Sequence, residues 1–186
     1  MGIEMGKEQG PTWYDECFAK DPLYSRRYKS VHYYPLWREL EKYITDEYGD
    51  PSIVELGCGV GQFAQMMYDL RHSDYKGYDF SPYAIKEAKS KCPLKFYQQD
   101  ITNPFYIDAD LVIILETMEH IKDDLSVFKN IKKDTGIIIT VPKFDGTSHV
   151  RFFKSEAEVR DRYSDFVDIE KLWTHSNYIA LCGKRK

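Results

Sequence analysis

The stretch Ile53-Val54-Glu55-Leu56-Gly57-Cys58-Gly59-Val60-Gly61 decides how this chain is organised, because an apolar run gives way there to three glycines at alternate positions. A β-rich run that ends in closely spaced glycines and continues into a helical pattern is typical of a parallel sheet that binds a nucleotide-like ligand. Gly57 and Gly59 allow a tight turn with positive φ and let a ligand approach the main chain. The helix expected at residues 62–70 has unpaired N–H groups at its start.

The spacing of these glycines separates two classes of nucleotide-binding protein. Dinucleotide folds usually carry G-x-G-x-x-G, whereas Glu55 and the three glycines form E-x-G-x-G-x-G. The spacing therefore disfavours an NAD-dependent enzyme, and the chain has no recognisable hydride-transfer residues.

The rest of the chain alternates between strand and helix patterns around this turn, which predicts an α/β fold with a parallel sheet. Strands are expected at residues 52–56, 75–80, 94–98, 110–115, 136–141, 166–174 and 177–182, the last two joined by a turn at His175-Ser176. Helices are expected at residues 36–44, 62–70, about 81–88, 123–131 and 155–163.

Acidic residues follow two of these strands. Asp79 comes 22 residues after Gly57, at the end of the second expected strand, where a carboxylate can accept hydrogen bonds from ribose hydroxyls. Asp100 follows the third strand, and without the preceding motifs it would be interpreted as a turn or cap residue.

Together these features resemble the class I S-adenosylmethionine (SAM) dependent methyltransferases. The first motif of that family corresponds to residues 54–61, its ribose acid to Asp79, its adenine acid to Asp100, and its motif after the fourth strand to residues 115–121. The resemblance implies a Rossmann-like α/β/α sandwich of three layers. It further implies a seven-stranded, mostly parallel sheet with one antiparallel strand in a C-terminal hairpin.

The resemblance also implies how SAM is held. The glycines line its methionine and ribose end, and Phe80 and Ile101 flank its adenine. The implied cofactor-binding residues are Glu55, Gly57, Cys58, Gly59, Gly61, Asp79, Phe80, Asp100, Ile101 and Glu116.

The run Glu116-x-x-Glu119-His120 resembles the E-x-x-E-H run of ubiquinone-biosynthesis O-methyltransferases and of small-RNA terminal 2′-O-methyltransferases. In those families the acids and the histidine can hold a divalent metal, and His149 lies in the loop that would supply a second imidazole. The resemblance thus gives Glu116, Glu119, His120 and His149 as a candidate metal set. In the competing interpretation there is no metal, His120 packs beside the cofactor and Glu119 caps a helix.

Candidate acceptor-side residues come from two other segments. Residues 13–34 are rich in tyrosine and precede the first strand, so they are expected to cover the ligand as short helices, with Tyr14, Tyr28 and Tyr34 at the substrate. His120, His149 and Arg151 are the candidate catalytic residues, and Arg151 would suit an acidic substrate. The alternatives are that the rings pack on the domain and that the arginine forms a surface ion pair.

Length and composition restrict the partners. A chain of 186 residues is expected to be one domain, with residues 1–50 as a helical cover and 51–186 as the core. A net charge of −4 gives no general attraction to nucleic acid, and no run is apolar enough to be a signal peptide or a membrane span.

Four widely spaced cysteines fit reduced thiols, so a cytoplasmic protein is expected. The oligomeric state stays open.

These observations leave several hypotheses for function. The first is transfer of a methyl group from SAM to an O or N atom of a small-molecule acceptor. The second is an RNA or protein methyltransferase that uses a basic patch made of Lys129, Lys132, Lys133 and residues 184–186. The third is a binding module that holds SAM without catalysis.

Overall fold

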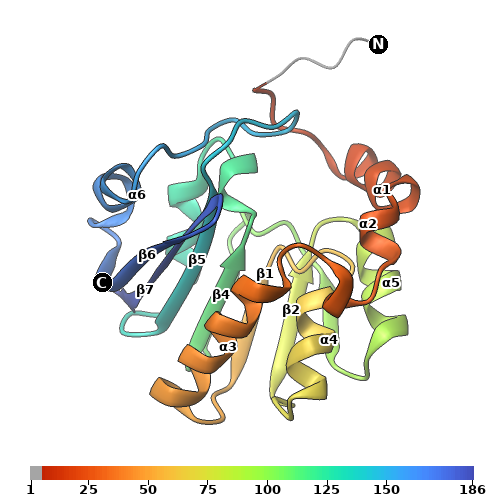
Figure 1. Ribbon diagram of the computed structural model, residues 1–186, viewed down its shortest axis with the longest axis horizontal. Coiled ribbons are helices and arrows are strands. Elements are labelled where there is room, and N and C mark those ends of the chain that lie inside the picture. Colours follow the sequence, from red (N-terminus) through yellow and green to blue (C-terminus); the bar gives the residue numbers. More distant parts are fainter. Residues whose placement is uncertain (1–5) are drawn as a thin grey trace.

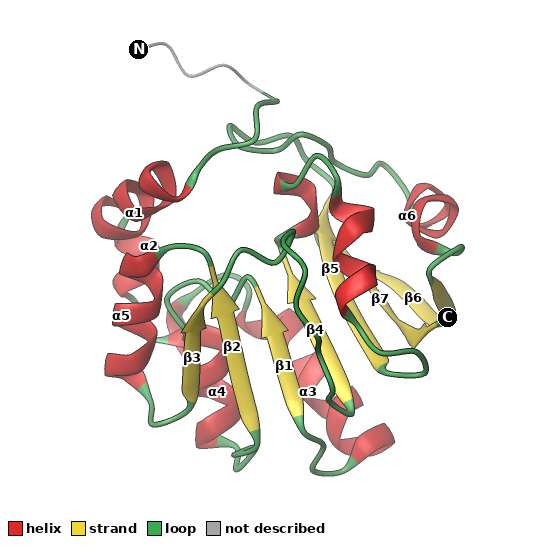
Figure 2. Ribbon diagram, turned by 180° about the vertical axis from the view of Figure 1, so that it is seen from behind, coloured by secondary structure: helices red, strands yellow, loops and turns green. Residues whose placement is uncertain are grey.

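The computed structural model describes residues 6–186, and a sheet of seven strands in the order β3-β2-β1-β4-β5-β7-β6 forms its centre (Figures 1 and 2). Neighbouring strands from β3 to β5 are parallel, whereas β7 runs antiparallel to both β5 and β6. The predicted Rossmann-like fold with a C-terminal hairpin is thereby confirmed. The strands are β1 (Ile53–Leu56), β2 (Tyr75–Asp79), β3 (Lys95–Gln98), β4 (Leu111–Leu115), β5 (Gly136–Pro142), β6 (Val167–His175) and β7 (Tyr178–Arg185).

The order of the strands reverses next to β1. Strands β2 and β3 extend to one side of it, and β4, β5, β7 and β6 extend to the other. Ligands of open parallel sheets bind outside the carboxyl ends of the strands at such a reversal. The glycine turn after β1 and the E-x-x-E-H run after β4 therefore meet at the same edge of the sheet.

Side chains of the central strands alternate between two apolar clusters, one on each face of the sheet. All five residues of β4 are buried, as expected for a strand covered on both faces. Three α-helices contribute to one cluster, and a 3-10 segment and a short α-helix contribute to the other. They are α3 (Tyr34–Tyr48), α4 (Gln62–Asp69) and α5 (Pro82–Lys91), then η3 (Asp124–Asn130) and α6 (Glu156–Tyr163). Within residues 6–186, no helix combines the length and apolar character needed to cross a membrane.

The N-terminal segment forms α1 (Pro11–Lys20), α2 (Pro22–Ser25) and η1 (Tyr28–Ser30). Figure 2 shows α1 above α2 and α5, at the side of the sheet where β3 lies. Asp15 attaches α1 to α5, because its Oδ1 accepts hydrogen bonds from the Ser81 hydroxyl and from the Tyr83 N–H at 3.2 Å. Residues 1–5 of the expected helical cover lie outside the described residues.

The helix expected at residues 123–131 is present as the 3-10 helix η3. Asp124, Val127 and Asn130 are all buried, and a spacing of three residues places side chains on one face of a helix with three residues per turn. The sequence predicted the position of this helix, and the structure adds its type.

The turn of the C-terminal hairpin also differs from the expected one. His175 pairs with Tyr178, so Ser176 and Asn177 are the two turn residues, rather than His175 and Ser176. Ser176 has a φ of 54°, which places it in the left-handed region that such tight turns require. The turn therefore lies one residue later in the chain than expected, because His175 still belongs to β6.

Asp124 is a buried carboxylate that holds η3 against α6 and the loop before it. Its oxygens accept hydrogen bonds from Arg162 Nε and from the Tyr163 hydroxyl, both at 2.9 Å, and Arg151 Nη1 lies 3.4 Å away. Arg151 also donates to the carbonyl oxygens of Met118, Ile121 and Lys122. The Asp124 carboxylate thus anchors the guanidinium group that fixes residues 118–122 at the edge of the sheet.

We expect Asp124→Ala to lower the free energy of unfolding by about 3–5 kcal/mol, because it leaves two arginines without their buried counterion. Asp123→Ala is the matched control: this neighbouring carboxylate is exposed and does not cap the helix. Chemical denaturation of both variants measures the difference. Equal stability of the two variants would contradict the role given to Asp124.

Candidate functional site

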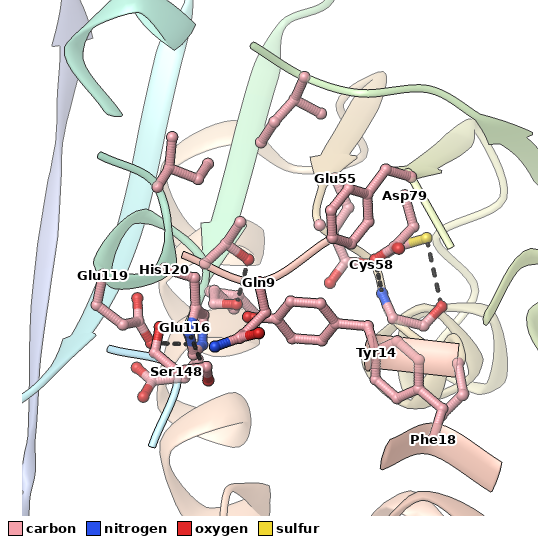
Figure 3. A pocket seen from close by; sticks show the side chains of 18 of the residues that line it. Gln9, Tyr14, Phe18, Glu55, Cys58, Asp79, Glu116, Glu119, His120 and Ser148 are labelled. Atoms are coloured by element: carbon pink, nitrogen blue, oxygen red, sulfur yellow. Dashed lines mark hydrogen bonds and ion pairs between the residues drawn. The ribbon is translucent and has the colours of Figure 1, made fainter. Parts of the chain in front are cut away.

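A cavity of about 380 Å³ opens at the carboxyl edge of the sheet. It is lined by the glycine turn, the ends of β2 and β3, the run after β4, the cover from residue 8 to 24, and residues 144–149. Figure 3 shows Glu116, Glu119, His120 and Ser148 gathered on one side and Glu55, Cys58 and Asp79 on the other, with Tyr14 extending between them. The predicted cofactor residues and the predicted catalytic histidines therefore line one continuous space.

The glycine turn after β1 has little freedom to accept other residues. Gly57 has a φ of 76°, and a Cβ on it would lie 2.3 Å from Thr117 Oγ1. The N–H groups of Gly57 and Cys58 donate to the Tyr78 carbonyl at 2.8 and 3.0 Å, so the turn is bound to β2. A backbone with no side chain at Gly57 keeps this corner of the cavity open.

Gly61 has a different role from the one expected. It begins α4 with a φ of 75°, and a Cβ on it would lie 2.8 Å from the Ala88 side chain of α5. It is not among the residues that line the cavity. The third glycine therefore allows α4 and α5 to pack closely.

The two acids at the ends of β2 and β3 lie at one end of the cavity. Asp79 is buried and accepts hydrogen bonds from the N–H groups of Gly59 and Ser81, both at 2.9 Å. Burial raises the pKa of Asp79 to about 6. Asp100 Oδ1 accepts from the N–H and hydroxyl of Thr102 at 2.9 and 2.7 Å. Phe80 and Ile101 line the same region, as the resemblance implied.

Glu55 is buried within β1 and faces the cavity from below the glycine turn. Its Oε2 accepts a hydrogen bond from the Tyr75 hydroxyl at 2.6 Å. Burial raises the pKa of Glu55 to about 8. The carboxyl group is therefore held on the sheet side of the turn, where its proton is retained near neutral pH.

The run after β4 presents two further carboxyl groups. Glu116 has a φ of 48°, which is costly for a residue with a side chain, and its N–H donates to the Thr140 carbonyl at 3.2 Å. Within the described part of the chain, Glu116 Oε1 and both carboxyl oxygens of Glu119 are buried without a hydrogen-bond partner. Burial raises the pKa of Glu116 to about 8 and the pKa of Glu119 well above its usual range. Unpaired buried oxygens of this kind need a ligand to satisfy them.

Two histidines meet beside Glu119. Its carbonyl oxygen accepts from the Val150 N–H at 2.8 Å, which brings the loop that carries His149 to the run after β4. His120 Nδ1 lies 3.1 Å from the Ser148 carbonyl, and His149 Nδ1 lies 3.1 Å from the Phe144 carbonyl. A carbonyl can only accept, so each Nδ1 carries the proton and each Nε2 presents a lone pair.

Burial keeps both imidazoles neutral: it lowers the pKa of His120 to about 4, and it also lowers the pKa of His149. One potential ligand atom from each of Glu119, His120 and His149 lies within 4.8 Å of the other two, and His120 Nε2 is 3.6 Å from Glu119 Oε1. Glu116 is not part of this group. Three of the four residues expected to bind a metal are thus brought together.

Three other expected acceptor-side residues lie elsewhere. Arg151 is bound to Asp124 and to the three carbonyls described above, so it shapes the run after β4 instead of facing an acidic substrate. The Tyr28 hydroxyl donates to Asp69 of α4 at 2.9 Å, and Tyr34 packs against the apolar cluster beneath α3. None of the three lines the cavity, whereas Tyr14 does. The structure thus places Arg151, Tyr28 and Tyr34 outside the described lining of the cavity.

Several lining residues were not expected from the sequence. Tyr33 and Trp37 line the cavity, with ring centroids 5.6 Å apart, and the Ser148 hydroxyl lies 3.0 Å from His120 Nδ1. Tyr33 immediately precedes α3 and Trp37 lies in its first turn, a spacing of four residues that places them on one face.

Comparison with known proteins supports the interpretation of the site. Residues 54–135 match the family model described as a methyltransferase domain. A search of curated proteins finds no match. Residues 54–135 therefore match a methyltransferase domain, and the chain around them has the Rossmann-like fold described above.

Solved structures resemble the chain in fold. PH0226 protein from Pyrococcus horikoshii has a TM-score of 0.72 and 17% identity, over 92% of this chain and 99% of that one. Magnesium protoporphyrin IX methyltransferase from Synechocystis with bound SAM has a TM-score of 0.70 and 17% identity, over 95% and 97% of the two chains. The N-methyltransferase NodS from Bradyrhizobium japonicum, in complex with S-adenosylhomocysteine (SAH), has a TM-score of 0.63 and 15% identity, over 90% of each chain.

We expect Glu55→Gln to change how stability depends on pH. The pKa of Glu55 is raised from 4.5 unfolded to about 8 folded, so its contribution is full at acidic pH and is lost as the pH rises towards 8. The variant should gain stability relative to the wild type between pH 5 and pH 9, on the order of a few kcal/mol. Denaturation across that range measures the gain, with exposed Glu170→Gln as control. A constant difference between Glu55→Gln and the wild type would contradict the raised pKa.

Proposed function

We propose that this methyltransferase domain binds SAM across the glycine turn and transfers its methyl group to an O or N atom of a small-molecule acceptor. The observation that carries the proposal is the single cavity that joins Asp79 and Asp100 at one end to Glu119 and His120 at the other. Such a cavity allows a nucleoside and an acceptor to meet at the carboxyl edge of the sheet, where this class of fold binds ligands.

The residues at the nucleoside end fit SAM. Asp79 is buried but lies on the cavity wall, where its carboxylate can accept from ribose hydroxyls, and Asp100 is placed one strand further out for the adenine. Glu116 Oε1 has no partner in the described chain and suits the ammonium group of the methionine moiety. SAM supplies a methyl group on a sulfonium sulfur, so the protein mainly has to hold a nucleophile in line with that bond.

The opposite end of the cavity fits a small acceptor. The cover contributes Gln9 and Tyr14 to its wall, and residues 144–149 contribute Phe144 and His149. None of the described residues that line the cavity is lysine or arginine, which disfavours the phosphate backbone of RNA. The named substrate of magnesium protoporphyrin IX methyltransferase, one of the structural neighbours, is a small molecule.

A second candidate is methylation of a hydroxyl group with the help of a divalent metal. Glu119 and the Nε2 atoms of His120 and His149 form the group that could hold the ion. Each imidazole is oriented by a carbonyl at its Nδ1, as is usual for histidines that bind metals. A hydroxyl acceptor needs such help because it is a weak nucleophile until it loses its proton.

We expect Asp79→Asn to weaken SAM binding about 10- to 100-fold, because it removes a charge-assisted hydrogen bond to the ribose. Isothermal titration of SAM into wild type and variant measures the loss. Asp74→Asn is the matched control, since this carboxyl is exposed at the opposite end of β2. Undiminished affinity of Asp79→Asn for SAM would overturn the ribose assignment, and no binding of SAM by the wild type would overturn the proposed function.

A further inference from the structure

We propose that the methyl acceptor is an amine that enters the cavity as an ammonium ion, with Glu119 as its counterion and Nε2 of His120 and His149 as its other hydrogen-bond acceptors. The inference deepens the proposed function and rests on it. It selects nitrogen over oxygen as the methylated atom, and it assigns Glu119 a role at the acceptor.

The charge of the side chains that line the cavity is the first argument for an amine. Its described lining holds six acidic side chains and neither lysine nor arginine: Glu8, Glu55, Asp79, Asp100, Glu116 and Glu119. Glu55 is paired with Tyr75, and the proposed SAM site uses Asp79, Asp100 and Glu116. Glu119 is left as a fully buried carboxyl with two unpartnered oxygens. An anionic acceptor would find no counterion there, whereas an ammonium ion satisfies both oxygens.

The arrangement of hydrogen-bond acceptors around Glu119 is the second argument. Glu119 and the two Nε2 atoms offer only lone pairs, and an ammonium group offers N–H donors in tetrahedral directions. Acceptors about 2.9 Å from such a nitrogen stand about 4.7 Å apart, whereas ligands about 2.1 Å from a metal stand about 3–3.5 Å apart. The three atoms all lie within 4.8 Å of one another, and one pair is 3.6 Å apart. They are close enough together for one ammonium group to contact all three.

The aromatic lining carries the third step. The Tyr14 ring lies edge-on to His120 with centroids 5.8 Å apart, and the Phe144 ring lies 5.7 Å from His149. Tyr33 and Trp37 line the same cavity. Ring faces attract cations and also cover the carbon skeleton that carries the amine. The site therefore suits an amine with an apolar body.

The reaction balances with these residues. The bound ammonium first gives a proton to an Nε2 atom of the two imidazoles, which are neutral and accept there. The nitrogen lone pair then forms the bond to the methyl carbon, while the carbon–sulfur bond breaks and its electron pair stays on sulfur, giving SAH. The methylated nitrogen carries the positive charge and leaves as an ammonium ion, and the imidazole releases its proton to solvent.

The test compares matched ligands that differ in charge: 2-phenylethylamine, 2-phenylethanol and phenylacetate, and the shorter set butylamine, butanol and butyrate. Each is titrated calorimetrically into SAH-saturated protein, and N-methyl product is measured with radiolabelled SAM. We expect the amine of at least one set to bind about 10-fold or more tightly than its alcohol, and the acid to bind most weakly. Glu119→Gln should abolish the preference for the amine, and Glu119→Asp should retain part of it.

Glu119→Gln keeps the volume of the buried side chain, so thermal melting should show a folded variant, and exposed Glu170→Gln should behave as the wild type. No preference for the amine in either set, or a preference that survives in Glu119→Gln, overturns the inference. Binding of Mn²⁺ that is lost in Glu119→Gln, without any amine preference, overturns it in favour of a metal. SAM titration is measured separately, so a protein that binds SAM but shows no amine preference contradicts this inference alone.

Discussion

The closeness of Gly57 to Thr117 is the constraint on which the site depends. A β-carbon on Gly57 would lie 2.3 Å from Thr117 Oγ1, so the turn after β1 and the run after β4 can approach only because one of them has no side chain. This approach brings the acids that suit a nucleoside and the acids and histidines that suit an acceptor to one cavity. The strand order places β1 next to β4, and the glycine lets their ends converge.

A second constraint is that the main chain around Glu119 must be held in place. Burial of a carboxyl group as complete as that of Glu119 costs free energy. The main chain around it is fixed by Arg151, whose guanidinium binds three carbonyls of residues 118–122 and approaches the carboxylate of Asp124. The positive charge of Arg151 is thus bound to main-chain carbonyls of residues 118–122 and lies close to Asp124. Arg151 does not bind the carboxyl oxygens of Glu119, although it binds the main chain of residues next to Glu119. These oxygens therefore stay unpaired beside the cavity.

Much of the fold could be predicted from the sequence because its signals are local. The glycine spacing, the all-apolar β4 and the acid after β2 each depend on a few neighbouring residues, and the structure places them as expected. The type of helix at η3 could not be predicted, since it depends on which side chains Arg162 and Tyr163 draw inward. The partners of Arg151 and Tyr28 could not be predicted for the same reason, because Asp124 and Asp69 are distant in sequence. Tyr33 and Trp37 show the converse, since a helical period cannot distinguish a core face from a cavity wall.

The attachment of the cover at Asp15 has a consequence for how ligands enter. Asp15 accepts from the Ser81 hydroxyl and the Tyr83 N–H at the start of α5, and the Ser81 N–H donates to Asp79. Displacement of α1 would remove the Asp15 carboxylate from the Ser81 hydroxyl and the Tyr83 N–H, and Ser81 is also the residue whose N–H binds Asp79. The position of α1 and the order of the first turn of α5 are therefore linked through Asp15. Exchange of the Tyr83 amide proton with solvent would report on both.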